Sequence, residues 1–347
     1  MTEKLGRIDV QKDTMLFITN FLLSQNIKET TTKENILKML PKIYENANDE
    51  MLLKILPYDS YLILEELIKY VKKNKIENNE ITNKVYELFD KEIRGISYLQ
   101  DAMIIVLRAT KDSHKYYIDK NVLNVLERLY TSENRKKAER YGKIEKLILG
   151  ILYTYGIVEK KIFRELICEK MEELIPEEKI VNFCIIRLNL NNIVNYRYVK
   201  WQDETTNEFV TYLRDLEDIE YYNPDLEDVL DIAVEQKTRG LDYKKYSREY
   251  YFYKSKKELD KSDKEFLKYM KSKNNNIFKY KFMEIIKNIK CGIRMEEKIL
   301  EYLNLDIDKD GQEFIDKYVK WYNDMPQYIL CGYSPKEFAI KYYGENN

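Results

Sequence analysis

The chain has 347 residues, and its 59 Lys and Arg nearly balance its 60 Asp and Glu, for a formal net charge of -1. The length allows two or three domains, and the scarcity of Gly (10) and Pro (6) favours a mainly α-helical protein over a β-rich or low-complexity one. The charge balance excludes the overall basic excess that is usual in proteins bound along a nucleic-acid backbone. A nucleic-acid function would therefore need a local basic surface.

Residues 1–48 are predicted to form N-terminal helices. Apolar residues repeat at helical spacing from Met15 to Leu22, and Thr32 is typical of a cap that begins a second helix. Pro41 is expected to interrupt or kink this second helix, because proline lacks an N–H donor and its ring crowds the preceding turn. Such apolar stripes favour a packed core over a partner-binding face.

The sequence shows no pattern typical of a membrane, secreted or metal-binding protein. No apolar run approaches membrane-spanning length, and the first residues lack a basic-then-apolar signal peptide. The four cysteines are far apart and form no C-x-x-C pair, which favours buried, reduced thiols over a zinc knuckle. We expect a cytoplasmic protein with no membrane partner, metal or cofactor.

Residues 49–142 are predicted to contain a winged-helix-like unit and a connector. A helix is expected from Pro57 and another around 81–89. The β-favouring run Ile104-Ile105-Val106-Leu107 and the short Tyr116-Tyr117-Ile118 segment then predict a hairpin.

The turn of that hairpin, predicted at 110–115, contains the single histidine, His114. A histidine that acts as a general base needs an orienting carboxylate and a pocket, so a solvated loop residue is expected here. The charged stretch 131–141 is expected to be a helical connector that ends at Gly142.

Residues 143–215 are predicted to form a winged-helix domain. A helix ends at Gly156, where glycine permits a left-handed cap, and a second helix covers 159–173. Pro176 is typical of the first turn of a third helix. The apolar period then changes from helical to alternating, which predicts a hairpin over 193–212.

The third helix, 177–190, is the segment that a winged helix inserts into the major groove of DNA, while the hairpin lies along the backbone. Glu177 and Glu178 at its front are unfavourable there, because DNA repels negative charge. The candidate nucleic-acid contacts are basic or aromatic residues of this helix and hairpin: Lys179, Arg187, Arg197, Tyr198 and Lys200.

Residues 216–347 are predicted to form a C-terminal helical bundle. The stretch 203–235 has twelve acidic residues and one basic residue, whereas 241–290 has fifteen basic, seven acidic and eleven Tyr or Phe. Lysines interleaved with aromatic rings suit a surface for single-stranded nucleic acid. The same composition suits a bundle in which acidic and basic helices neutralise each other around an aromatic core. The sequence leaves open whether 241–290 is surface or core.

Two patterns resemble catalytic or metal motifs. Asp225, Glu235 and Lys237 match the sequence pattern of a metal-dependent nuclease motif. That motif lies on strands, but the apolar residues here repeat at helical spacing. Residues 306–311 begin like a calcium-binding EF-hand loop, but Lys317 occupies the position of the closing glutamate. Phosphate-loop and nucleophile-elbow patterns are absent. The sequence therefore predicts no catalytic residue and favours a non-enzymatic protein, with an enzyme left open.

The tail of the chain resembles a segment of uncharacterised proteins from low-GC Gram-positive bacteria, the NNTRxWxxxGxTPxEL stretch that often precedes a SEC-C motif. Residues 149–157 and the turn 221–224 resemble further parts of those proteins. The SEC-C motif is absent here, and Met325-Pro326 replaces the expected arginine. The resemblance implies an architecture rather than an activity, and its tail matches are Asn323, Asp324, Tyr328, Gly332, Pro335 and Glu337.

The sequence thus supports three hypotheses. The first is a non-enzymatic winged-helix protein that binds double-stranded DNA as a regulator, a function argued from the shape of the predicted unit. The second is a protein–protein interaction scaffold, and the third is a metal-dependent nuclease. The target of binding and the oligomeric state are not determined by the sequence.

Overall fold

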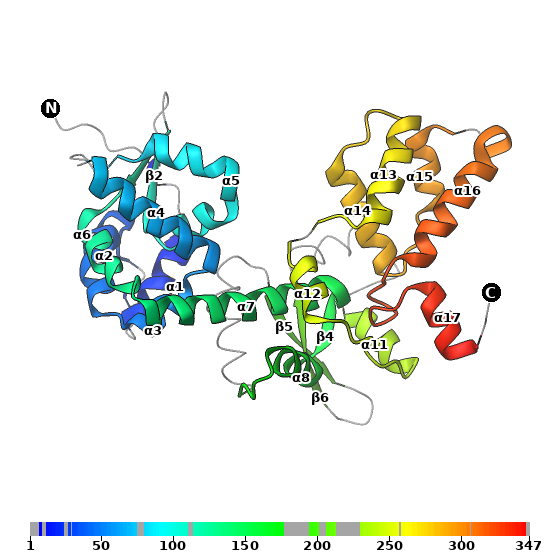
Figure 1. Ribbon diagram of the computed structural model, residues 1–347, viewed down its shortest axis with the longest axis horizontal. Coiled ribbons are helices and arrows are strands. Elements are labelled where there is room, and N and C mark those ends of the chain that lie inside the picture. Colours follow the sequence, from blue (N-terminus) through cyan, green and yellow to red (C-terminus); the bar gives the residue numbers. More distant parts are fainter. Residues whose placement is uncertain are drawn as a thin grey trace. The chain divides into compact units, whose positions relative to one another are not determined.

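The computed structural model is mainly α-helical with two small antiparallel sheets (Figure 1). Its contacts divide the chain into two compact units within helix α7 (Ser132–Tyr155): the described residues up to Glu145 belong to the first unit, and the second begins at Lys146. The structure describes residues 7–8, 12–23, 27–28, 30–74, 80–109, 114–176, 194–200, 206–212, 230–256, 258–305 and 307–344.

The first unit packs helices around a three-stranded sheet. Its helices are α1 (Lys12–Leu23), α2 (Lys33–Asn46), α3 (Asp49–Ile55), α4 (Tyr58–Asn74), α5 (Thr82–Asp101), α6 (Lys120–Leu126) and the start of α7. Its strands follow the order β1 (Arg7–Ile8), β2 (Ile105–Ala109) and β3 (His114–Ile118), and both pairings are antiparallel.

Local sequence accounts for helix α2. The Thr32 side chain accepts a hydrogen bond of 3.3 Å from the Asn35 N–H, as expected of its cap. The helix continues through Pro41 to Asn46, so the expected interruption is wrong. Buried apolar residues on both sides of the proline, such as Ile36 and Ile43, keep the helix against the core and offset the lost hydrogen bond.

Two other local expectations are corrected in this unit. Gly142 does not end a connector helix, because α7 is continuous from Ser132 to Tyr155. A Cβ at Gly142 would lie only 2.7 Å from the Cβ of Tyr58, so this glycine permits a close approach of α7 to α4. His114 is not in the turn but begins β3, where it pairs with Ala109 and is exposed.

The second unit combines a second sheet with a set of helices. Its strands are β4 (Ile157–Glu159), β5 (Val194–Lys200) and β6 (Thr206–Tyr212). Besides the end of α7, its helices are α8 (Lys160–Met171), α11 (Leu230–Thr238), α12 (Arg248–Lys254), α13 (Lys261–Lys273), α14 (Lys279–Lys290), α15 (Glu296–Leu303), α16 (Ile307–Asp324) and α17 (Pro335–Tyr343).

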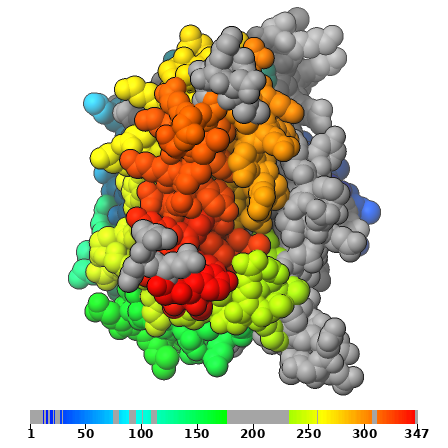
Figure 2. All heavy atoms as spheres, turned by 90° about the vertical axis from the view of Figure 1, so that its right-hand side faces the viewer, coloured from blue at the N-terminus to red at the C-terminus, as the bar shows by residue number. Residues whose placement is uncertain are grey.

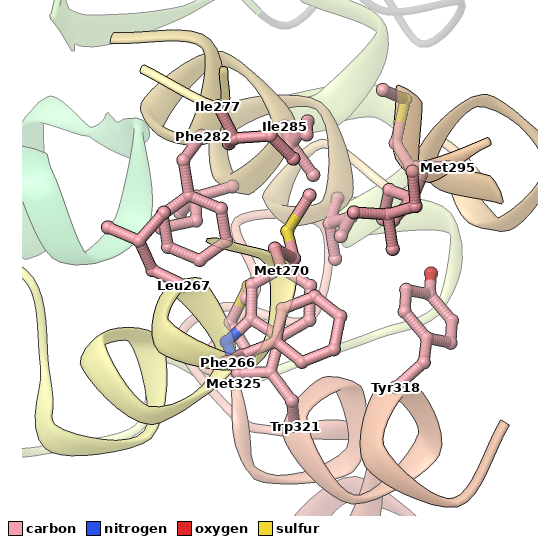
Figure 3. Close-up of a cluster of buried hydrophobic side chains, with 14 of the residues drawn as sticks. Phe266, Leu267, Met270, Ile277, Phe282, Ile285, Met295, Tyr318, Trp321 and Met325 are labelled. Atoms are coloured by element: carbon pink, nitrogen blue, oxygen red, sulfur yellow. The ribbon is translucent and has the colours of Figure 1, made fainter. Parts of the chain in front are cut away.

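Aromatic rings form the core between α13, α14 and α16 (Figure 3). The rings of Phe266 and Trp321 stack with their centres 4.2 Å apart, and Phe282 packs 5.5 Å from Trp321. The Trp321 indole N–H donates a hydrogen bond of 2.9 Å to the carboxylate of Asp263, so the one polar atom of the indole is satisfied inside the core.

Helix α17 begins with a capping box. The Ser334 hydroxyl accepts from the Glu337 N–H, and the Glu337 carboxylate accepts from the Ser334 N–H, as the sequence Ser-Pro-Lys-Glu predicts. Figure 2 views the face on which α16 (orange) and α17 (red) lie. Large apolar side chains on these two helices are exposed: Ile315, Val319, Ile340 and Tyr343.

Candidate functional site

The second sheet is built from a short strand between two helices and a longer hairpin (Figure 1). Helix α7 ends at Gly156, whose φ of +70° turns the chain directly into β4. Strand β4 pairs antiparallel with β6, with Ile157 opposite Thr211. The returning strand β6 therefore lies in the middle of the sheet, and β5 lies at its edge.

Three of the five predicted contact residues lie on the edge strand β5. In the register of the hairpin, Arg197 pairs with Phe209, Tyr198 with Glu208 and Lys200 with Thr206. Strand β5 thus brings these three residues together within four positions. The other two, Lys179 and Arg187, and the predicted third helix lie outside the described residues.

The chain leaves α8 through a defined turn that precedes the predicted third helix. Glu172 adopts a left-handed conformation with φ of +55°, and the Glu173 N–H donates to the carbonyl of Cys168 at 3.2 Å. The guanidinium of Arg164 donates to the carbonyl of Ile175 at 3.2 Å, which fixes the chain beyond the turn against α8. This basic residue of α8 therefore stabilises the turn.

Close backbone approaches join the end of α7 to later segments of the second unit. A Cβ at Gly150 would lie 2.0 Å from the carbonyl oxygen of Tyr251, so only glycine fits where α7 meets α12. A Cβ at Gly156 would lie 2.6 Å from the ring of Tyr328, and one at Gly332 would lie 2.5 Å from the ring of Tyr155. The end of α7 and the loop between α16 and α17 therefore pack against each other.

Buried tyrosine hydroxyls connect these segments. The hydroxyls of Tyr155 and Tyr251 are 2.6 Å apart, and that of Tyr155 also donates to the carbonyl of Lys244. The Tyr246 hydroxyl donates to the Gly332 carbonyl at 2.7 Å. Burial raises the pKa of Tyr155 and of Tyr246 well above the usual value, so both remain neutral hydrogen-bond donors.

Nearby ion pairs use several of the basic residues of 241–290. Lys244 pairs with Glu337 and lies 4.4 Å from the centre of the Tyr246 ring. Lys254, which is buried, pairs with Asp260. Hydrogen bonds to Lys244 and to the Ser334 N–H lower the pKa of the half-buried Glu337 despite the opposing effect of burial. Part of the positive charge in this segment is therefore neutralised within the fold.

The aromatic residues of 241–290 divide between core and surface, which answers the question that the sequence left open. Tyr251, Phe266 and Phe282 are buried, as the bundle interpretation predicts. Phe278 and Tyr280, in contrast, are 59% and 65% exposed.

The described residues do not place the two motif-like stretches as metal sites. Glu235 lies on helix α11 and pairs with Arg239, whereas the nuclease motif needs strands, and Asp225 lies outside the described residues. Helix α16 begins at Ile307, so the EF-hand-like stretch is helical rather than a loop around an ion. No group of three or more His, Cys, Asp or Glu side chains is placed to hold a metal among the described residues.

The three cysteines whose side chains are described are free thiols. Burial raises the pKa of Cys291 and of Cys331 to about 12, so these two thiols are not reactive thiolates.

No helix in the described part of the chain combines the length and the apolarity needed to cross a bilayer.

Comparisons with known proteins give no match. No family model, no curated protein and no solved structure matches this chain.

Sequence reasoning missed strand β4 and the tyrosine network. The β-branched pair Ile157-Val158 directly after Gly156 was a signal for β4, but three residues are too few to show an alternating pattern. The partners of Tyr155 lie about 90 residues further along the chain, at 89 residues for Lys244 and 96 for Tyr251, and no local pattern indicates such pairings.

Proposed function

We propose that residues 143–215 form a winged-helix unit that binds double-stranded DNA, and that the protein is a non-enzymatic regulator of the bacterial cytoplasm. The observation that carries the proposal is the pairing of β4 with β6. A winged helix needs a short strand after its first helix that pairs with the returning strand of the hairpin, and the order β4-β6-β5 meets this requirement.

The proposed mode of binding uses two elements. The predicted helix 177–190 enters the major groove, where Lys179 and Arg187 contact bases or phosphates. The hairpin lies along the backbone, and Arg197, Tyr198 and Lys200 of β5 contact phosphate oxygens. An edge position suits β5 for this role, because no other strand among the described residues pairs with its outer side.

Titration of a labelled duplex, followed by fluorescence anisotropy, tests this proposal. Because each phosphate contact releases a counterion, the affinity of the protein for DNA should fall steeply between about 50 and 200 mM salt. The double variant Arg197→Ala/Lys200→Ala should weaken binding and lower the slope of log K against log salt by about 2.

The first hairpin offers a matched control with the same two residue types. Arg108 pairs with Glu34 at 2.9 Å and Lys115 with Glu80 at 3.1 Å, so Arg108→Ala/Lys115→Ala should leave DNA affinity unchanged. No duplex binding by the parent protein at low salt, or an equal loss in both double variants, would rule out the proposed site.

A protein-interaction scaffold is the second candidate, and the exposed apolar residues of α16 and α17 favour it. Val319 is 45% exposed and Tyr343 is 71% exposed, on helices that share one face of the second unit (Figure 2). Co-purification of a specific protein that persists after nuclease treatment and is lost in Val319→Lys would favour this candidate. Nuclease-sensitive co-purification would instead favour the DNA-binding proposal.

A further inference from the structure

An exposed pair of aromatic rings lies where α13 leads into α14. Phe278 is 59% exposed and Tyr280 is 65% exposed, and their rings stack with centres 5.8 Å apart and planes at 14°. Large rings held in water lose the stabilisation that burial would give them. Two such rings side by side are therefore a feature that folding of the second unit does not explain.

A small pocket opens beside the two rings. Its volume is about 200 Å³, below the roughly 300–1,000 Å³ of sites for drug-sized ligands, and suits a single planar ring system. Asn274 and Asn276 line this pocket. The amide of Asn276 can donate to and accept from the edge of a heterocyclic base, as asparagine does in base recognition.

The inner wall of this pocket belongs to the core of the second unit. Met270, Ile277 and Ile285 line it, and all three are buried in the cluster around Phe282 (Figure 3). The Asn274 side chain donates a hydrogen bond of 2.7 Å to the Tyr302 carbonyl, and its oxygen accepts from the Asn276 N–H at 2.9 Å. The pocket is therefore preformed on a rigid base.

The rings lie in a basic stretch of the chain. Between Lys264 and Phe282 the sequence has six lysines and one glutamate, and all of these lysines except Lys273 are exposed. Lys279 and Lys281 flank Tyr280 directly. Helix α14 begins here with no side-chain cap and no acidic residue in its first turn, so its dipole adds to the positive potential.

We propose that Phe278, Tyr280 and the adjoining pocket bind single-stranded nucleic acid. One base stacks on the paired rings, a neighbouring base enters the pocket against Asn274 and Asn276, and Lys279 and Lys281 contact the flanking phosphates. Duplex DNA does not fit this role, because its bases are stacked on each other and present no free ring face. The inference does not rest on the winged-helix proposal, which uses other residues and another form of nucleic acid.

Fluorescence anisotropy with labelled oligonucleotides tests the inference on the full-length protein. Oligo(dT) and oligo(U) of equal length are the probes, and their relative affinities distinguish DNA from RNA as the source of the strand. An abasic oligonucleotide of the same length carries the same phosphates without bases and should bind at least fivefold more weakly. Phe278→Ala and Tyr280→Ala should each weaken oligo(dT) binding by between about fivefold and about a hundredfold.

The controls separate stacking from general charge and from the winged-helix proposal. Tyr343 is 71% exposed on α17, so Tyr343→Ala removes a ring of similar exposure and should leave oligonucleotide affinity unchanged. Lys279→Gln/Lys281→Gln should lower the slope of log K against log salt by about 1.4, because single strands release about 0.7 counterion per contact. Arg197→Ala/Lys200→Ala should affect duplex binding only.

Three outcomes would overturn the inference: no binding of either oligonucleotide at low salt, equal binding of the abasic strand, or an unchanged affinity in both ring variants. Since both rings are exposed, Phe278→Ala and Tyr280→Ala should keep the thermal unfolding midpoint of the parent protein. A variant that unfolds at a lower temperature would show that its ring is structural, which also contradicts the inference.

Discussion

The hairpins β2–β3 and β5–β6 have a similar strand pairing on one side but differ in what pairs with their first strand. In each unit a residue or strand located between two helices pairs with the second strand of the hairpin: Glu80 pairs with Tyr117 of β3, and β4 pairs with β6. In the first unit β1 covers the outer side of β2. In the second unit no strand among the described residues covers the outer side of β5.

The segment before each hairpin also differs. In the first unit a single helix, α5, runs for 20 residues from Thr82 to Asp101 and leads through Met103, with φ of +59°, into β2. In the second unit α8 ends after 12 residues in a turn at Glu172. The second hairpin thus differs from the first in the shorter helix that precedes it and in its edge strand, which carries three residues of the proposed DNA contact.

The largest expected effect is the difference in stability between two glycine variants of α7, Gly150→Ala and Gly142→Ala. Gly150→Ala places a Cβ against the backbone of α12, which cannot move aside without displacing the helix, and should lower the free energy of unfolding by about 3 kcal/mol or more. Gly142→Ala meets the Tyr58 side chain and gains alanine's helix propensity of about 1 kcal/mol, so its net cost should be about 1 kcal/mol. Urea unfolding of both variants measures the difference, and equal midpoints would contradict it.

A partly buried lysine gives the second unit a pH dependence. Burial lowers the pKa of Lys290 to about 8, and repulsion from nearby Lys254 acts in the same direction, against the opposing effect of Asp260 and Asp263. The unfolded pKa is near 10.5, so between pH 8 and 10 the unfolded chain binds more protons than the native state. Relative to a Lys290→Met variant, the stability of the parent protein should therefore rise by about 2 kcal/mol over this interval.

Urea unfolding between pH 7 and 10 measures this rise, and Lys290→Met is its control. The variant should be more stable than the parent at pH 7 and should show no rise toward pH 10. Buried thiols and tyrosines lower the stability of both proteins from about pH 9 upward, because burial raises the pKa of Cys291, Cys331 and residues such as Tyr155 and only the unfolded chain loses their protons. A difference in stability between parent and variant that does not change from pH 8 to 10 would contradict the assignment to Lys290.

The smallest expected effect concerns the ion pairs of the first hairpin. Arg108→Ala and Lys115→Ala each remove a partly exposed pair, with Glu34 and Glu80 respectively, and should each cost about 0.5 kcal/mol. Raising the salt concentration should reduce this cost, because solvent ions screen such pairs. A cost above about 2 kcal/mol would show that these residues do more than neutralise neighbouring carboxylates.

Much of the local structure could be predicted from the sequence, because its causes lie within a few residues. The Thr32 cap, the capping box at Ser334 and the left-handed end of α7 at Gly156 are confirmed. The change to an alternating period also predicts β5 and β6 correctly. Of the candidate site, the sequence predicts the hairpin that carries Arg197, Tyr198 and Lys200, while their contact with DNA stays a prediction.

The tertiary structure decided what depends on partners distant in the chain. Local signals at Gly142 and Pro41 favour helix ends, but packing of α7 on α4 and burial of the apolar face of α2 keep both helices continuous. Long-range packing also decides which aromatic rings of 241–290 are buried. Phe282 packs against Trp321 and is buried, whereas Phe278, four residues earlier, remains exposed. Composition fixes how many rings and charges a segment has, but only the long-range contacts of the folded chain decide which of them face water.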